Sequence, residues 1–356
     1  MRIYRKQSAQ DEKGVFLMNS KIRHGTVYVG AVMLFILIAV LSGAGCSRKD
    51  RTAYEAGQTE NMFDDLISVG FSQLGSESVW RSANTVSIQE TLTRENGFFL
   101  IYNNARQKQE NQIKAIRSYI SQRVDVIVFS PLTEEGWDTV LQEAYDAGIP
   151  VITSDRQVNA SKEELVTAWV GGDMEAEGEK AAKWLQQQPL GKEPINIVVL
   201  TGTEGSSAAE GRSIGFHRIA DTVPHWKILE EKSGDFTMAK GKEIMEEFLA
   251  SYPDIDVLVS QNDDMTFGAI EAMEERGIVP GQDITIISYD AVRQALEMVR
   301  DGKINVDVEC SPLLGPVTAD LIRRIVGKEA YEKDNPVEEL VFTKENVEEY
   351  LDDRTY

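Results

Sequence analysis

The strongest constraint on the fold is a regular alternation of short apolar segments with helical patterns, which begins at residue 66. Between two of these segments Ile113, Ile116 and Ile120 recur at helical spacing, which predicts an amphipathic helix. An alternation of strands and helices favours a parallel, doubly wound sheet with helices on both faces. The apolar segments are 66–71, 98–102, 124–129 and 148–153.

The same rhythm starts again after residue 172 and gives a second block of similar size. A chain of 356 residues with 42% hydrophobic residues is long enough for two domains with cores of their own. No short-period repeat is present, which excludes a solenoid. We therefore expect an α/β fold with two doubly wound parallel-sheet domains. The strands expected in the second block are 196–200, 227–230, 257–260, 284–288 and 305–309.

Polar residues gather where these strands end. Ligands bind at the carboxyl edge of an open parallel sheet, so two facing domains would present such residues to one cleft. A single Asp-Arg pair at a strand end is usually a surface ion pair, but repeated clusters on the same sheet edges favour a shared cleft. The clusters are 76–81, Asn104, Asp155–Arg156, 205–212, 262–264 and Asp290.

The first cluster combines hydroxyls, a carboxylate (Glu77), a flat ring (Trp80) and a guanidinium (Arg81). Together these groups suit a polyhydroxylated ligand, because apolar C–H faces stack on a ring and hydroxyls pair with charged forks. The alternative is an ordinary strand-to-helix turn with a serine cap and a core tryptophan.

Composition and motifs argue against several classes of function. A net charge of −21 repels phosphate backbones, so we expect no nucleic-acid partner. The sequence lacks the nucleophile elbow, the zinc-protease motif and the phosphate-binding loop, so we expect no enzyme. Asp263 and Asp264 have no further ligand nearby in sequence, so we expect hydrogen bonds there, with no metal and no cofactor.

The N-terminus reads as an export signal. The apolar block 27–41 follows Lys21 and Arg23 and leads through small residues into Cys46. It resembles a bacterial lipoprotein signal, in which the cysteine is lipidated, although Gly43 stands where such signals usually place leucine. An uncleaved anchor is the alternative, and Met18 is a second possible start of the chain. If Cys46 carries a lipid, Cys310 has no disulfide partner, and we expect Cys310 to be a half-buried thiol.

Beyond the signal, the chain is similar to the type I periplasmic sugar-binding proteins of ABC importers, the ribose and galactose group. Within that group the galactofuranose-binding members are the most similar. The likeness extends from residue 66 to about 342, and the order and spacing of its motifs make it specific. The motifs are 69–73, 75–78, Trp80–Arg81, 107–115, Asp155–Arg156, 233–237, 262–265, 268–270 and Val308–Glu309 with Pro312.

The resemblance implies roles for individual residues. Trp80 is expected to stack on a sugar ring. Asn104 stands where the galactofuranose binders carry an aspartate, and an amide both donates and accepts, so the hydroxyl that it meets can differ. The residues expected to hydrogen-bond the sugar are Arg81, Asp155, Arg156, Arg212, Asn262 and Asp290, with Ser76, Glu77, Asn104, Phe236 and Glu309 as further candidates.

The resemblance also implies a domain organisation with three chain crossings, near Gly171, Cys310 and Val341. Closure about such a three-segment hinge would trap a monosaccharide and display a surface to a membrane permease. The expected parts are a lipoprotein signal (1–46), a tether (47–63), an N-terminal domain (64–170 plus 311–340) and a C-terminal domain (171–310 plus 341–356).

We expect a monomer that is lipid-anchored on the extracytoplasmic face of a bacterial cell membrane. A sugar sensor for a membrane histidine kinase or chemoreceptor would have the same fold and pocket and is the alternative. A transcription regulator would need a basic helix-turn-helix where this chain carries the signal.

Overall fold

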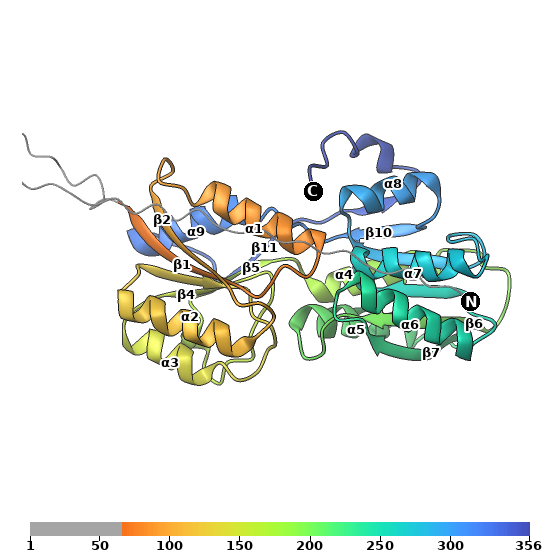
Figure 1. Ribbon diagram of the computed structural model, residues 1–356, viewed down its shortest axis with the longest axis horizontal. Coiled ribbons are helices and arrows are strands. Elements are labelled where there is room, and N and C mark those ends of the chain that lie inside the picture. The colour runs from red at the N-terminus through yellow and green to blue at the C-terminus, as the bar shows by residue number, and fades with distance from the viewer. Residues whose placement is uncertain (1–65) are drawn as a thin grey trace, which may run out of the picture. The chain divides into compact units, whose positions relative to one another are not determined.

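The computed structural model describes residues 66–356, which form two six-stranded sheets (Figure 1). We name the sheet with order β11-β5-β4-β3-β1-β2, together with its helices, the N-lobe. The sheet with order β12-β10-β9-β8-β6-β7, together with its helices, is the C-lobe. The expected signal, Cys46 and the tether lie outside the described residues. Within the described part of the chain, no helix combines the length and apolarity needed to cross a bilayer.

All strand pairs of the N-lobe are parallel. The N-lobe consists of β1 (Ile67–Gln73), α1 (Val79–Thr91), β2 (Phe98–Asn104), α2 (Gln109–Gln122), β3 (Val126–Phe129), α3 (Asp138–Asp146), β4 (Val151–Ser154), the 3₁₀ turn η1 (Glu163–Leu165), β5 (Ala168–Gly171), α9 (Gly315–Gly327) and β11 (Asp334–Pro336).

The C-lobe has the same parallel arrangement except at its edge, where β12 runs antiparallel to β10. The C-lobe consists of α4 (Met174–Gln186), β6 (Ile195–Thr201), α5 (Ser207–Ala220), β7 (Trp226–Ser233), α6 (Met238–Ser251), β8 (Val257–Ser260), α7 (Asp263–Glu275), β9 (Thr285–Asp290), α8 (Arg293–Asp301), β10 (Val306–Glu309), β12 (Val341–Thr343) and the 3₁₀ turn η2 (Val347–Glu349).

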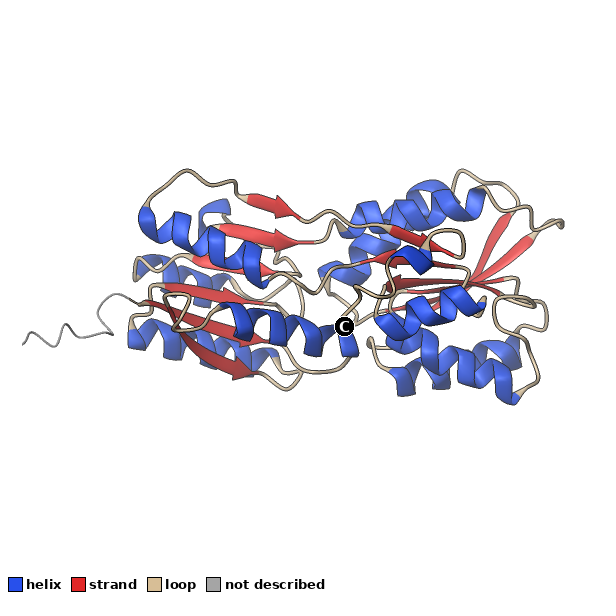
Figure 2. Ribbon diagram, turned by 90° about the horizontal axis from the view of Figure 1, so that it is seen from above, coloured by secondary structure: helices blue, strands red, loops and turns tan. Residues whose placement is uncertain are grey.

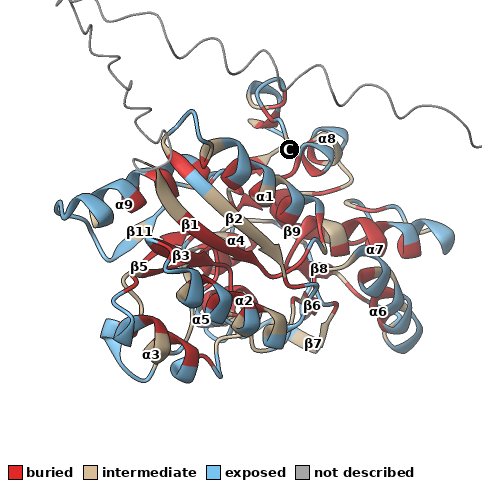
Figure 3. Cartoon of the chain, turned by 60° about the vertical axis from the view of Figure 1, so that its left-hand side comes forward, coloured by how far each residue is buried: buried red, intermediate tan, exposed pale blue. Residues whose placement is uncertain are grey.

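Helices cover both faces of each sheet, as the doubly wound fold requires (Figure 2), and apolar side chains fill the space between sheet and helices on both faces. Along β3, Val126 and Val128 pack with Ile322 of α9, whereas Ile127 and Phe129 pack with the α2 and α3 side. Successive side chains of a strand point to opposite faces, so an all-apolar strand feeds both cores. The inner strands are accordingly buried, the edge strands β2 and β7 are largely half-buried, and the outer helix faces are exposed (Figure 3). The predicted fold class is confirmed.

Two edge strands were missed by sequence analysis, which placed the last strand at 305–309. β11 and β12 are three residues each, and their composition lacks the apolar run of a buried strand. β11 contains Pro336, which has no N–H to donate and is tolerated at a sheet edge.

The backbone passes between the two sheets three times. The first crossing joins β5 to α4, the second joins β10 to α9, and the third joins β11 to β12. One face of α1 binds the second crossing: Trp80 Nε1 donates to the Cys310 carbonyl (2.6 Å), Asn84 Nδ2 donates to the Pro312 carbonyl (3.1 Å), and Ser87 Oγ accepts from the Gly315 amide (3.0 Å). The start of α1 is therefore held against this crossing.

Candidate functional site

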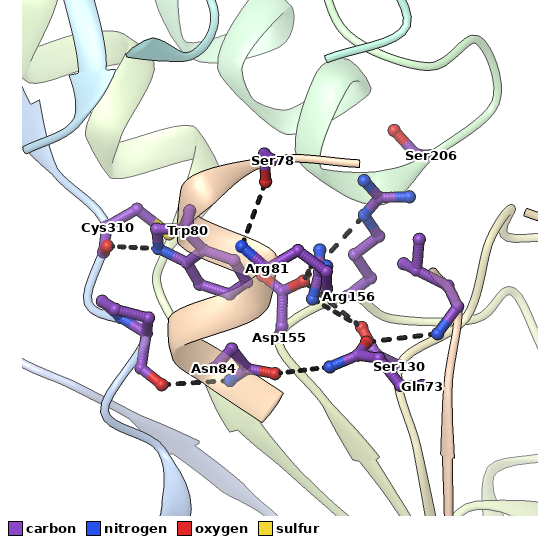
Figure 4. Close-up of polar contacts among 12 residues, drawn as sticks. Gln73, Ser78, Trp80, Arg81, Asn84, Ser130, Asp155, Arg156, Ser206 and Cys310 are labelled. Carbon is purple, nitrogen blue, oxygen red and sulfur yellow. Dashed lines mark hydrogen bonds and ion pairs between the residues drawn. The ribbon is translucent and has the colours of Figure 1, made fainter. Parts of the chain in front are cut away.

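A small cavity lies where strand ends of the two lobes meet, and Figure 4 shows polar contacts among several of the residues around it. Its volume is about 20 Å³, which is room for roughly one water molecule. The N-lobe contributes residues from the β1–α1 loop, the first turn of α1 and the segment directly after β4, and the C-lobe contributes residues from five segments. The lining consists of Glu77, Ser78, Trp80, Arg81, Asp155, Arg156, Ala208, Arg212, Phe236, Asn262, Asp290 and Cys310.

Local sequence signals position the helices around this cavity. The side chains of Ser78, Ser206, Thr237 and Asn262 each cap a helix by accepting a hydrogen bond from a backbone N–H two or three residues into it. Such caps satisfy the free N–H groups at a helix start. The helices therefore begin shortly after the strands, and α1 and α5 place residues of their own in the lining of the cavity.

Arg81 is the centre of the N-lobe half of the site. Its Nη2 lies 2.7 Å from Asp155 Oδ2, its Nε lies 3.0 Å from Glu77 Oε1, and its Nη1 donates to Ser130 Oγ at 3.2 Å. Burial alone would lower the pKa of Arg81, but the two carboxylates outweigh burial and raise it. The guanidinium is fully charged and held in one orientation.

Trp80 is buried between this arginine and the second crossing. The Arg81 guanidinium carbon lies 4.5 Å from the centre of its ring, and the indole N–H is bonded to Cys310, as described above. Trp80 thus presents a fixed aromatic surface to the cavity, with its single polar group already satisfied.

Arg156 has donor capacity that the protein does not use. Its Nη1 donates to the Leu132 carbonyl at 3.1 Å, but its Nε is buried with no hydrogen-bond partner. Its guanidinium carbon lies 5.0 Å from the ring centre of Phe236, a C-lobe residue. Burial and the neighbouring Arg81 lower the pKa of Arg156 to about 10. A buried cation with a free N–H is costly unless a ligand accepts the bond.

Arg212 is the centre of the C-lobe half. Its Nε donates to Glu177 Oε2 at 2.6 Å, its Nη1 donates to the Gln261 carbonyl, and its Nη2 donates to Asp290 Oδ1 at 3.3 Å. Burial raises the pKa of Asp290, and Arg212 only partly offsets it. Asn262 donates to the Phe236 carbonyl at 3.3 Å while it caps α7, so its amide is also fixed.

Three of the lining residues have left-handed backbone conformations. The φ angles are 67° at Asp155, 58° at Phe236 and 108° at Asp290. Such angles are unfavourable for non-glycine residues and cluster at functional sites, where the surrounding structure holds them. Phe236 also packs directly over Gly202, where any Cβ would collide with its ring. The strand ends are therefore shaped to aim these side chains at the cavity.

Hydrogen bonds around the cavity join the two lobes. Asp264 Oδ2 of α7 accepts from the amide of Val79, the first residue of α1, at 3.1 Å. The amide of Gln157 donates to Ser207 Oγ at 2.8 Å, and the amide of Glu134 donates to the Gly205 carbonyl at 2.8 Å. These bonds hold the lobes closed over the cavity.

The structure brings most of the residues predicted from the sequence into this one cavity. Three lie outside the lining: Ser76 is exposed, Asn104 accepts from the Arg106 amide at 2.8 Å, and Glu309 accepts from Arg354 Nη1 at 2.8 Å. For these three, as for the predicted residues in the lining, contact with a ligand stays a prediction. The predicted residues in the lining are Glu77, Trp80, Arg81, Asp155, Arg156, Arg212, Phe236, Asn262 and Asp290.

Some parts of the site were not predicted from the sequence, and the prediction for Cys310 was wrong. Cys310 is only 2% exposed, not half-buried, because Trp80 and the Arg212 cluster enclose the second crossing. Glu177 lies inside a helix and its role in holding Arg212 has no local signal. Ser78 was expected as a hydroxyl of the first cluster and as a helix cap, and it is both a cap and part of the lining, whereas Ala208 had no signal of its own within the cluster 205–212.

Comparison with known proteins assigns the family. The periplasmic binding protein domain matches residues 69–329, and the chain belongs to this family. The chain is 40% identical over 291 residues to the galactofuranose-binding protein YtfQ of Escherichia coli, covering 81% of this chain and 88% of that protein. The curated relatives of this kind are sugar-binding transport proteins rather than enzymes.

Two solved structures are similar in fold and sequence. A Mycobacterium smegmatis protein in complex with β-D-fucofuranose has a TM-score of 0.79 and 43% identity, covering 82% of this chain and 95% of that one. The binding component of the arabinose ABC transporter from Shewanella sp. ANA-3, bound to α- and β-L-arabinofuranose, has a TM-score of 0.77 and 38% identity, covering 81% and 95%.

Proposed function

We propose that this chain is the extracytoplasmic receptor of an ABC importer and binds one monosaccharide between its two lobes. The observation that carries the proposal is the lining of the cavity, to which the N-lobe and the C-lobe each contribute an arginine–carboxylate cluster and an aromatic ring. Because the cavity has room for about one water molecule in this arrangement, a monosaccharide would need the lobes to lie further apart than they do here. Planar guanidinium and carboxylate groups suit vicinal hydroxyls, and the rings suit the C–H faces of a sugar.

The relatives point to a five-membered ring as the ligand form. Their names and titles refer to galactofuranose, β-D-fucofuranose and L-arabinofuranose. These three sugars share one configuration at C2, C3 and C4 and differ only in the substituent that C4 carries. We infer that the ligand is an aldofuranose with this configuration at C2, C3 and C4. We further infer that the arginines hydrogen-bond the ring hydroxyls, and that the site is less selective for the substituent at C4.

Binding would be coupled to closure of the lobes. A ligand shifts an opening equilibrium only through contacts that it makes better in one state, so a sugar that touches both lobes favours the closed state. Arg156 would supply such a contact from the N-lobe, because its buried Nε has no hydrogen-bond partner and only a 4.0 Å ion-pair contact with Asp155, and Asp290 would supply one from the C-lobe. We propose the three crossings as the hinge, with 64–170 plus 311–340 and 171–310 plus 341–356 as the moving domains.

We further propose that Cys46 is lipidated, so that the receptor is held on the outer face of the bacterial membrane and passes its sugar to a permease there. The support is the sequence pattern at 21–46, with its basic residues, apolar block and small residues before the cysteine. A monomer on a tether would suffice, because both halves of the site come from one chain.

Titration calorimetry with D-galactose, D-fucose and L-arabinose tests the ligand class, with D-ribose and D-glucose as sugars of different ring configuration. We expect the first three to bind with one site per chain and the last two to bind far more weakly. Carbon-13 NMR of bound galactose labelled at C1 reports the ring form directly. Binding of only six-membered rings, or no preference among the five sugars, would contradict the proposal.

A further inference from the structure

A pair of glutamates lies where the three crossings meet. Glu177 is in the first turns of α4, next to the first crossing, and is 0% exposed. Glu339 is in the third crossing and is half-buried. A Cβ at Gly172, in the first crossing, would collide with carboxylate oxygens of both glutamates. One ligand atom from each glutamate and the Cys310 sulfur, in the second crossing, lie within 4.8 Å of one another.

If both glutamates are ionised, the pair has too few hydrogen-bond donors for its carboxylate oxygens. Glu177 Oε2 accepts from Arg212 Nε, but Glu177 Oε1 is buried and has no donor in the structure. Glu339 Oε1 receives only a long bond of 3.4 Å from the Ser311 amide. Two carboxylates that face each other have no hydrogen to share, whereas a carboxylic acid beside a carboxylate donates one strong bond. A proton on Glu339 would satisfy the orphan oxygen of Glu177.

We propose that Glu177 and Glu339 share one proton at neutral pH, and that this proton-bridged pair positions Arg212 and so links the sugar site to all three crossings. Glu177 would be a positioning residue, since it acts on the ligand only through the guanidinium that it holds. The part that concerns sugar affinity rests on the proposed function; the shared proton does not.

The electrostatics around the pair agree with this assignment. Burial and the neighbouring Glu177 raise the pKa of Glu339, while Lys180 and Arg212 oppose the rise. Like charges that share a site raise one pKa strongly, as in paired catalytic carboxylates. A metal ion is disfavoured, because the Arg212 cation already lies 2.6 Å from Glu177. The titratable and charged groups that face the pair are Lys180, Arg212, Tyr289, Asp290 and Cys310.

The first test needs no sugar and uses Glu339→Gln, whose amide replaces the proposed O–H donor. The matched control is Glu338→Gln, an exposed neighbour on the same segment. Infrared difference spectra near neutral pH should show a carboxylic-acid band in the wild type that E339Q loses and E338Q keeps. An unchanged acid band in E339Q would overturn the shared proton.

Thermal unfolding against pH gives an independent readout of the same proton. A folded-state pKa raised above the unfolded value of about 4.3 gives stability that is present at low pH and lost as pH rises. Because the pKa of Glu339 is raised to about 10, the melting temperature of the wild type should fall relative to that of E339Q from about pH 5 up to about pH 10. Parallel curves would overturn the proposal, as would one tightly held equivalent of zinc in the purified wild type.

The second test measures affinity for L-arabinose and compares E339Q with Glu339→Ala. The glutamine should bind within about twofold of the wild type, because it keeps a donor for Glu177. The alanine leaves a buried oxygen unpaired and should bind roughly tenfold or more weakly. Equal loss in both variants would show that Glu339 merely fills space. If the wild type binds no sugar, the proposed function fails, while the infrared and unfolding results still decide the shared proton.

Discussion

Replacing Arg156 with methionine should stabilise the sugar-free protein and weaken sugar binding at the same time. Burial and Arg81 lower the pKa of Arg156 from 12.5 to about 10. Because arginine is charged at neutral pH in both the folded and the unfolded chain, this lowering corresponds to a cost to folding on the order of 3 kcal/mol, at about 1.4 kcal/mol for each factor of ten. Methionine is apolar and of similar length, so it removes that cost.

Some favourable contacts are lost in the same variant. The hydrogen bond from Arg156 to the Leu132 carbonyl contributes about 1 kcal/mol, and the contact with the Phe236 ring contributes about 0.5–1 kcal/mol. The net expectation is a gain of roughly 1–2 kcal/mol in the free energy of unfolding, which raises the melting temperature by a few degrees. Affinity should fall by roughly 10- to 150-fold, since a charge-assisted hydrogen bond to the sugar is worth about 1.5–3 kcal/mol.

Scanning calorimetry without sugar and titration calorimetry with L-arabinose measure the two effects. Arg117→Met is the matched control, because Arg117 forms a half-exposed pair with Glu143, far from the cavity in the fold. That variant should alter neither melting nor affinity by much. An R156M protein that melts below the wild type and binds arabinose equally well would refute both the cost assigned to Arg156 and its place in the site.

Three further outcomes are expected. Trp80→Ala should abolish sugar binding while the fold stays intact, whereas Trp80→Phe, which keeps a ring but loses the bond to Cys310, should retain part of the affinity; equal affinities for both variants in titration calorimetry would remove stacking from the account. Cys46→Ser should move the protein from the membrane to the soluble fraction, and continued membrane association would indicate the uncleaved anchor. The hydrogen bond to Glu231 raises the pKa of His217 to about 9, so the stability that it adds is present below about pH 6.5 and is lost as pH rises through 9; His217→Gln should lack this loss in thermal unfolding curves.

The fold could be predicted from the sequence because the spacing of apolar residues differs between the buried strands and the helices. A segment such as 126–129 is apolar at every position, which only a strand covered on both faces can accommodate. The short edges β11 and β12 have no such run, because each is three residues long and pairs with a single neighbouring strand.

Only those residues of the candidate site that lie at strand ends could be predicted from the sequence. Arg156 and Asp290 were found because they directly follow apolar strands. Asn104 has the same position in sequence, yet its side-chain oxygen is taken up by its own turn. The roles of Glu177 and Glu339 could not be predicted from the sequence, because they depend on a contact between the α4 helix and the third crossing. These two segments are far apart in the sequence, and no local pattern indicates their contact.

A crystal structure of the protein grown with D-galactose would show directly whether one sugar is bound between the N-lobe and the C-lobe. The account predicts one five-membered sugar ring in the cavity, with Arg156 bonded from the N-lobe and Asp290 from the C-lobe. A sugar that contacts residues of one lobe only, or that binds at another surface, would contradict it.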